Sequence, residues 1–194
     1  MRVLAGSAGG IQLQVPETTV RPTMDRVKAA IFSSLGESVV GARVLDLFAG
    51  TGALGIEALS RGAASALFVE ENRAAVRAIE QNFIRTKVRG QVRSQEVFAF
   101  LESARISEPF DIIFADPPYE KTKSGGEFTR SLLENRQLAE MLQPRGIFVL
   151  EKRPGEQLVS PQLWHIARAK TYGATEVLFL RHADAPPAGD GADE

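Results

Sequence analysis

The sequence predicts an α/β protein with a mostly parallel sheet and helices on both of its faces. Strand and helix patterns alternate five times between residues 43 and 150, as they do where parallel strands are joined by crossover helices. The run Phe110-Asp-Ile-Ile-Phe-Ala115 is nearly all apolar, which is typical of a strand buried on both faces. A glycine-rich run, Gly50-Thr-Gly-Ala-Leu-Gly55, lies between a predicted strand and a predicted helix. Open sheets of this class bind ligands at such turns.

The elements of this predicted core follow one another with short connections. An amphipathic helix precedes the first strand, with Thr23 as its N-cap and Gly36 at its end, because these residue types favour helix starts and stops. Asn72 is the predicted N-cap of a later helix that runs to about Thr86. The predicted strands are residues 43–48, 66–69, 91–94, 110–115 and 147–150, the helices between them are residues 53–61, 73–86, 97–103 and 128–142, and residues 144–146 form a turn.

The two ends of the chain have different patterns. Residues 2–4 and 11–15 are extended runs around a glycine-rich turn, which predicts a β-hairpin. This hairpin is either an edge element that only packs or an arm that contacts substrate. Residues 164–170 and 175–180 predict a closing hairpin, with one strand antiparallel on the sheet. We expect a single domain over residues 1–182, with residues 1–20 as its N-terminal extension, and a disordered acidic tail over residues 183–194.

The composition excludes several classes of protein. The 194 residues include no cysteine and two histidines, so disulfides and thiolate metal sites are excluded and no metal centre is expected. No apolar run approaches the roughly 18 residues of a membrane span, and the first residues lack the apolar core of a signal peptide; the predicted location is the cytoplasm. The net charge is −1, but without the last twelve residues 23 basic and 20 acidic residues leave +3. That balance permits nucleic-acid binding.

The glycine run predicts a nucleoside-binding turn. It fits the pattern G-x-G-x-x-G between a strand and a helix, in which Gly50 and Gly52 allow the backbone to approach a ligand closely. Glu70 ends the next strand, 20 residues beyond Gly50, where a carboxylate can accept hydrogen bonds from ribose hydroxyls. Asp46 lies inside an apolar strand and needs a hydrogen-bond partner there. Two ligands fit this pattern: a dinucleotide and S-adenosylmethionine.

The run Asp116-Pro-Pro-Tyr119 favours the second ligand. Two prolines fix the backbone and remove two amide donors, so the Asp116 carboxylate and the Pro117 carbonyl can accept the two N–H bonds of an exocyclic amine on a base. Tyr119 can stack on that base, an interaction worth about 1–3 kcal/mol. Acceptors aimed at an amine stabilise the positive charge that develops as its nitrogen attacks a methyl group. Asp116 either positions the amine or also takes its proton, and the base must be flipped out or single-stranded.

With these motifs the chain resembles the class I S-adenosylmethionine-dependent methyltransferases, and more narrowly the RsmD family, which methylates the N2 amine of a guanine in 16S rRNA. The resemblance covers about residues 1–182. It rests on the motifs Arg21-Pro-Thr-Met-Asp-Arg-Val27, Asp46-Leu-Phe-Ala-Gly-Thr-Gly-Ala-Leu-Gly-Ile-Glu-Ala-Leu-Ser-Arg-Gly62, Asp116-Pro-Pro-Tyr119 and Tyr172-Gly173.

The resemblance implies a Rossmann-like fold with a mostly parallel seven-stranded sheet, and a substrate that is an assembled or partly assembled small ribosomal subunit. We expect a monomer. The implied cofactor contacts are Asp46, Phe48, Ala49, Gly50, Thr51, Gly52, Glu70, Glu96, Val97 and Asp116; the implied catalytic residues are Asp116, Pro117 and Tyr119; and the implied substrate contacts are Arg21, Thr23, Arg26 and Tyr172.

Three other functions fit parts of the sequence. An amino-methyltransferase acting on adenine or cytosine, in DNA or another RNA, would use the same acceptor pair. An NAD-dependent oxidoreductase would use the glycine turn and Glu70, and a non-catalytic RNA-binding module would retain only the fold. Several basic residues are either phosphate contacts or a solvated face, namely Arg85, Lys87, Arg89, Arg93, Lys121 and Lys123.

Overall fold

The chain forms a seven-stranded sheet in the order β3-β2-β1-β4-β5-β7-β6. The computed structural model describes residues 1–15, 24–118, 127–156, 158 and 162–184. β1 to β5 are parallel, and β7 is antiparallel to both β5 and β6, so the predicted mostly parallel sheet with a closing hairpin is confirmed. The strands are β1 (Arg43–Leu47), β2 (Ser65–Glu70), β3 (Gln91–Ser94), β4 (Phe110–Ala115), β5 (Leu142–Lys152), β6 (Trp164–Tyr172) and β7 (Thr175–His182).

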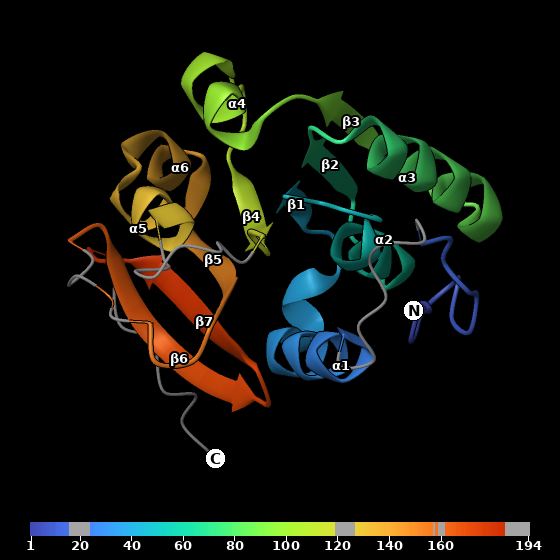
Figure 1. Cartoon of the computed structure of the whole chain (residues 1–194), viewed down its shortest axis with the longest axis horizontal. Coiled ribbons are helices and arrows are strands. Elements are labelled where there is room, and N and C mark those ends of the chain that lie inside the picture. Colours follow the sequence, from blue (N-terminus) through green and yellow to red (C-terminus); the bar gives the residue numbers. More distant parts are fainter. Residues whose placement is uncertain (16–23, 119–126, 157, 159–161, 185–194) are drawn as a thin grey trace.

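Helices cover both faces of the sheet and enclose two apolar cores (Figure 1). One core lies between α1, α2 and α3 and side chains such as Phe68 and Phe114. The other lies between α4, α5 and α6 and side chains such as Leu45 and Phe148. Adjacent residues of β1, Val44 and Leu45, fall in different cores, because side chains alternate across a strand. The helices are α1 (Met24–Leu35), the 3₁₀ helix η1 (Gly36–Val39), α2 (Ala53–Ser60), α3 (Arg73–Thr86), α4 (Val97–Ser103), α5 (Glu127–Glu134) and α6 (Arg136–Glu140).

The structure corrects the prediction of one helix over residues 128–142. Two helices, α5 and α6, occupy this region, and Leu142 already belongs to β5. The break lies at Asn135, whose side-chain oxygen accepts a hydrogen bond from the Leu138 backbone N–H at 2.8 Å and so caps α6. The predicted turn at residues 144–146 lies within β5 and does not precede it. It coincides with an irregularity of that strand, because Phe110 pairs with Leu142 and Ile112 with Ile147, so the register of β5 on β4 shifts across residues 143–146.

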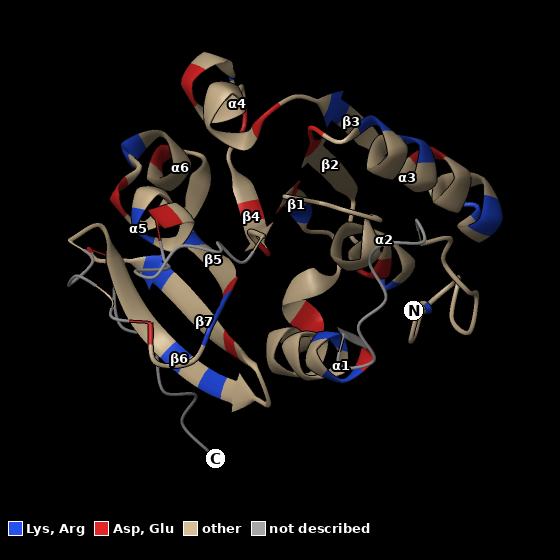
Figure 2. Cartoon of the chain, in the orientation of Figure 1, with Lys and Arg blue, Asp and Glu red and all other residues tan. Residues whose placement is uncertain are grey.

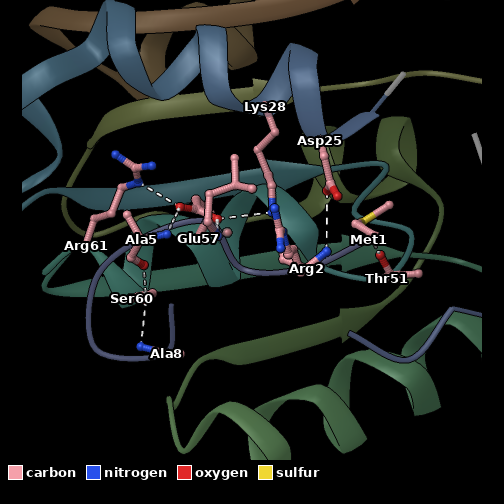
Figure 3. Close-up of polar contacts among 12 residues, drawn as sticks. Met1, Arg2, Ala5, Ala8, Asp25, Lys28, Thr51, Glu57, Ser60 and Arg61 are labelled. Atoms are coloured by element: carbon pink, nitrogen blue, oxygen red, sulfur yellow. Dashed lines mark hydrogen bonds and ion pairs between the residues drawn. The ribbon is translucent and has the colours of Figure 1, made fainter. Parts of the chain in front are cut away.

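Residues 1–15 pack along α2 and α3. The predicted hairpin is present as a single antiparallel bridge between Arg2 and Gln12, and residues 16–20 lie outside the described part of the chain. Ser60 of α2 joins the loop of this hairpin: its hydroxyl accepts from the Ala8 N–H at 2.9 Å and donates to the Ala5 carbonyl at 2.6 Å (Figure 3). The segment is therefore held to the domain by backbone hydrogen bonds as well as by apolar contacts.

A buried carboxylate fixes the start of this segment. Glu57 of α2 has no exposed surface, and it accepts hydrogen bonds from the backbone N–H groups of Leu4 at 2.7 Å and Ala5 at 3.1 Å. Its oxygens also pair with Lys28 Nζ of α1 at 3.1 Å and with Arg61 Nε at 2.8 Å (Figure 3). Burial lowers the pKa of the Lys28 ammonium, and the adjacent Glu57 carboxylate acts in the opposite direction. Four groups from three parts of the chain thus converge on one carboxylate.

Glycine at position 6 is required by this docking. Its φ is +82°, and a Cβ there would lie 1.8 Å from the Ser60 carbonyl oxygen. Gly10 has a similar φ of +86°, but a Cβ there would meet nothing within 4 Å. We expect Gly10→Ala to cost only the left-handed backbone strain, about 1–2 kcal/mol, and Gly6→Ala to cost more because the segment must also leave Ser60. Urea unfolding and amide exchange at residues 7–8 measure the difference; equal losses in the two variants would refute the docking role.

Candidate functional site

A cavity of about 480 Å³ lies at the carboxyl ends of β1, β2, β4 and β5. In open parallel sheets this edge is where ligands bind. Two sequence motifs that are far apart in the chain, the glycine turn and the Asp-Pro-Pro run, meet here. The lining residues are Met1, Val27, Lys28, Asp46, Phe48, Ala49, Gly50, Thr51, Ala53, Leu54, Glu70, Glu71, Ala75, Glu96, Val97, Asp116, Pro117, Pro118, Glu151, Ala174 and Thr175.

The glycine turn forms one wall through an unusual backbone path. Phe48, Gly50 and Gly52 all have positive φ, at 55°, 54° and 75°. Of these three residues Phe48 has the strained backbone, because a residue with a side chain loses about 1–2 kcal/mol in the left-handed region. Its ring packs edge-on against Phe98 and Phe128, with centroids 6.4 and 5.7 Å away. These aromatic contacts hold the strained residue where the chain leaves β1.

The third glycine of the motif brings α2 close to the sheet. A Cβ on Gly55 would lie 2.3 Å from the Phe68 ring and 3.1 Å from the Asp46 carboxyl. The Gly55 backbone N–H donates to Asp46 Oδ2 at 2.9 Å. Asp46 is therefore hydrogen-bonded by the motif, as the sequence predicted for a carboxyl group inside an apolar strand.

Burial raises the pKa of the Asp46 carboxyl from its ordinary value of 3.8 to about 8. The Gly55 hydrogen bond acts against this shift, and the nearby carboxylates of Asp116 and Glu70 add to it. The folded chain consequently holds a proton on Asp46 at neutral pH. A neutral Asp46 reduces the repulsion among the three carboxyl groups at this edge.

This shift predicts a stability change with pH. Because the pKa is higher in the folded state, the folded chain binds more protons at Asp46 between pH 3.8 and about 8, and the free energy of unfolding falls as pH rises through that window. Asparagine resembles the protonated carboxyl and has no such linkage. We expect the wild-type urea midpoint to fall further than that of Asp46→Asn between pH 5 and pH 8, in buffers of matched ionic strength. Parallel pH profiles for the two proteins would contradict the assignment.

Glu70 and Glu96 line the cavity, and both also stabilise the fold. Glu70 accepts from the Gly50 N–H at 2.8 Å through one oxygen and from the Asn72 N–H at 2.8 Å through the other. Glu96 caps α4 by accepting from the N–H groups of residues 98 and 99 at 3.0 and 2.8 Å. A carboxylate offers about four acceptor positions, so each side chain retains capacity for a ligand hydroxyl or amine.

Asp116 leaves the end of β4 and faces the cavity together with Pro117 and Pro118. Both prolines lack an N–H, so this segment offers acceptors without competing donors. Glu151 lies beside Asp116 at the end of the neighbouring strand: Ala115 of β4 is in register with Leu150 of β5. This part of the cavity wall also includes Ala174 and Thr175 of the closing hairpin.

The cavity is acidic. Among its described lining residues, one basic side chain, Lys28, faces six carboxyl groups, and Lys28 is itself paired with Glu57. Basic side chains lie elsewhere, along α3, β3 and β6 (Figure 2). The carboxyl groups are Asp46, Glu70, Glu71, Glu96, Asp116 and Glu151. Such a cavity favours ligands rich in N–H donors or positive charge and disfavours phosphate.

Most of the predicted site residues meet in this cavity, but three described ones do not line it. Gly52 shapes the turn, since its N–H donates to the Ala49 carbonyl at 2.7 Å. Arg26 is exposed on α1, and Tyr172 packs half-buried against the first core. Tyr119, Arg21 and Thr23, as well as Lys121 and Lys123, lie outside the described residues.

Three charged groups at the cavity were not predicted as site residues: Lys28, Glu71 and Glu151. Glu151 had a usable signal: it is the first residue after an apolar strand core, as Glu70 and Asp116 are after theirs. Lys28 had none, because a lysine in an amphipathic helix is usually solvated.

Asn82 joins the glycine turn to the N-terminal segment. This fully buried side chain of α3 donates to the carbonyls of Thr51 and Gln14, both at 3.1 Å, and accepts from the Gln14 N–H at 2.7 Å. The glycine turn is thus held by hydrogen bonds from Asn82, a residue that belongs to none of the sequence motifs.

Two properties of the described residues bear on other classes of protein. No group of three or more His, Asp or Glu side chains within them could hold a metal ion. None of the helices in this part of the chain is long and apolar enough to cross a membrane.

Comparisons with known proteins match almost the whole chain. The family model "Conserved hypothetical protein 95" matches residues 1–181. The Bacillus subtilis protein YlbH is 37% identical over 93% of this chain and 98% of its own length. Ribosomal RNA small subunit methyltransferase D of Escherichia coli is 34% identical over 98% of this chain and 94% of its own. The solved structure of Escherichia coli yhhF superimposes with a TM-score of 0.79 at 32% identity and covers 96% of this chain and 99% of that one. The fold is that of class I methyltransferases, and the chain belongs to the matched family, which its curated members identify as the RsmD family.

Proposed function

We propose that this chain transfers the methyl group of S-adenosylmethionine to the N2 amine of a guanine in 16S rRNA. One observation carries the proposal: the glycine turn with Glu70 and the Asp116-Pro-Pro segment line the same cavity. The first pair suits a nucleoside, and the second suits a planar amine. A site that holds both is suited to transferring a group from one to the other.

The charge of the cavity supports S-adenosylmethionine over a dinucleotide. Besides the neutral Asp46, five carboxyl groups line it, and these would repel the pyrophosphate of NAD, whereas the ammonium and sulfonium of S-adenosylmethionine are cationic. Glu70 lies where it can accept from the ribose hydroxyls, and Glu96 and Val97 lie where the adenine would bind. When bound, this cofactor supplies a methyl group on a positively charged sulfur.

The residues at the end of β4 supply the other half of the reaction. The lone pair of a nucleobase amine is delocalised into the ring, so the nitrogen is a weak nucleophile. Asp116 and the Pro117 carbonyl would accept its two hydrogens, hold it in line with the methyl group and stabilise the charge that develops on it. The carboxyl groups would also keep the RNA phosphates out of the cavity and admit only the base, which must be flipped out of a helix to enter.

Family membership supports rRNA as the substrate. The Escherichia coli relative is named as a small-subunit rRNA methyltransferase, and the match spans nearly both chains. The arginines of α3 and β3 are exposed and would provide phosphate contacts outside the cavity; Figure 2 shows where they lie along these elements.

Transfer of tritium from labelled S-adenosylmethionine tests the proposal. Naked DNA, naked 16S rRNA and 30S particles that lack the modification are incubated in parallel, and the labelled nucleotide is identified by digestion and chromatography. We expect label in 16S rRNA as N2-methylguanine. Label confined to DNA, or present as methyladenine or methylcytosine, would refute the proposal, and calorimetric binding of NAD without S-adenosylmethionine binding would refute the cofactor.

A further inference from the structure

We propose that Glu151 makes the site specific for guanine by accepting the N1–H beside the reacting amine. This inference rests on the proposed function and goes beyond it, because it names the residue that distinguishes guanine from the other bases that carry an amine.

The position follows from the sheet register. β4 and β5 are parallel neighbours, and Ile113 pairs with Phe148 and Ala115 with Leu150. Asp116 and Glu151 are the next residues on the two strands, and neighbouring strands lie about 4.8 Å apart. Both side chains line the same cavity. Two carboxyl groups therefore stand on neighbouring strands at the substrate end, where both can reach one edge of a bound base.

The base edges differ in what they present beside the amine. In guanine the ring nitrogen next to the N2 amine carries a hydrogen, so N1 is a donor. In adenine the nitrogen beside the N6 amine is a bare acceptor, and in cytosine N3 beside the N4 amine is also a bare acceptor. If Asp116 holds the amine, a carboxylate at the adjacent position attracts the guanine N1–H and repels the lone pair of adenine or cytosine. Glu151 would therefore favour the binding of guanine and also disfavour the binding of adenine and cytosine.

Glu151 has the surroundings this role requires. It is half-buried directly after the buried run Phe148–Leu150 of β5, where a hydrogen bond to a charged acceptor is stronger than in water. The Nζ of the next residue, Lys152, pairs with Glu176 at 2.7 Å and donates to two backbone carbonyls. A carboxylate has about four acceptor positions, so one contact within the protein does not by itself exclude a base N–H. The neighbouring turn of the closing hairpin, at Ala174 and Thr175, bounds the same part of the cavity.

The test uses 2-aminopurine, which keeps the 2-amine but has a bare N1 and no O6. The target nucleotide is first mapped with wild-type protein. Then 30S particles are reconstituted from 16S rRNA that carries either guanine or 2-aminopurine at that nucleotide, and initial rates of methyl transfer are compared. We expect wild-type protein to prefer guanine by about 100-fold or more, as sites built to bond an N–H reject analogues without it.

The variant Glu151→Gln keeps the size of the side chain and offers either a carbonyl oxygen or an amide N–H. We expect its rate of methyl transfer to guanine to fall by about tenfold or more, while its rate on 2-aminopurine stays the same or rises. Its preference for guanine over 2-aminopurine should therefore drop below about tenfold. The preference that remains would come from recognition of O6, which 2-aminopurine lacks. The affinity for S-adenosylmethionine, measured by calorimetry, and the thermal midpoint should match those of the wild type. Glu140→Gln, on an exposed residue of α6 outside the cavity, is the matched control and should keep the wild-type preference.

The outcomes separate the two proposals. If wild-type protein methylates guanine and Glu151→Gln keeps the wild-type preference, the role of Glu151 is refuted and the proposed function stands. If Glu151→Gln loses cofactor affinity, Glu151 acts on the cofactor and the inference is also refuted. If wild-type protein places no methyl group on any guanine, both proposals fail together.

Discussion

Asp116→Ala is expected to lower kcat by about 10²–10³-fold while the affinity for S-adenosylmethionine changes by less than about threefold. Removing one preorganised group that stabilises developing charge typically has this effect on the chemical step. Asp116 lines the cavity from the end of β4, two strands away from Glu70 at the end of β2. The other implied cofactor contacts stay in place when its side chain is removed, so most of the cofactor affinity should survive the loss of this one contact. Single-turnover rates on saturating 30S substrate and calorimetric titration with the cofactor measure the two effects separately.

Asp116→Asn decides how the carboxylate acts. If Asp116 only accepts hydrogen bonds from the amine, the asparagine carbonyl retains part of the interaction, and its rate should lie clearly above that of Asp116→Ala. If Asp116 takes the proton, the two variants should be equally slow. Asp184→Ala, on an exposed residue after β7, is the control and should keep wild-type kinetics. Full activity in Asp116→Ala would remove this residue from the mechanism.

Glu57→Ala is expected to lower the free energy of unfolding by about 3–5 kcal/mol, the usual cost of breaking a buried ion pair by removing one partner. The loss leaves Lys28 buried and unpaired, and it frees the Leu4 and Ala5 amides as well. Since small domains have only about 5–15 kcal/mol of stability, this single change removes a large part of it. Equilibrium urea unfolding at a fixed pH measures the effect.

A matched ion pair on the surface provides the control. Glu108 pairs with Arg43 at 3.0 Å, but its side chain is 68% exposed, and Glu108→Ala should cost less than about 1 kcal/mol. The isosteric Glu57→Gln keeps acceptor capacity without the charge and should fall between the two. A loss below about 1 kcal/mol in Glu57→Ala would show that the N-terminal segment and Lys28 find other partners.

The sequence was sufficient for the parts of the molecule that depend on local pattern. Apolar strands, a glycine turn and an Asn72 cap are each encoded within a few residues, and the structure places them where the pattern predicted. The cavity followed because the carboxyl ends of parallel strands share one edge, which brings Asp46, Glu70 and Asp116 together without any knowledge of side-chain packing.

The remaining features depend on contacts between distant segments. Glu57 lies in a helix, where a glutamate is usually solvated, and only the docking of residues 1–15 buries it. Asn135 interrupts what reads as one helix because its side chain caps the next turn. Tyr172 matches a family motif but packs against the core, since the register of the closing hairpin, and not the motif, fixes where its ring points.

The position of β7 has a consequence for the order in which the protein can be made. β7 is the last strand in the chain, yet it lies between β5 and β6 in the sheet, and the turn that leads into it supplies Ala174 and Thr175 to the cavity. During synthesis, β6 emerges before the strand that it must pair with, and the edge of β5 remains open until residue 182 has left the ribosome tunnel. A nascent chain can therefore fold its first five strands around the glycine turn, but the part of the cavity wall at Ala174 and Thr175 forms only after β7 has been made.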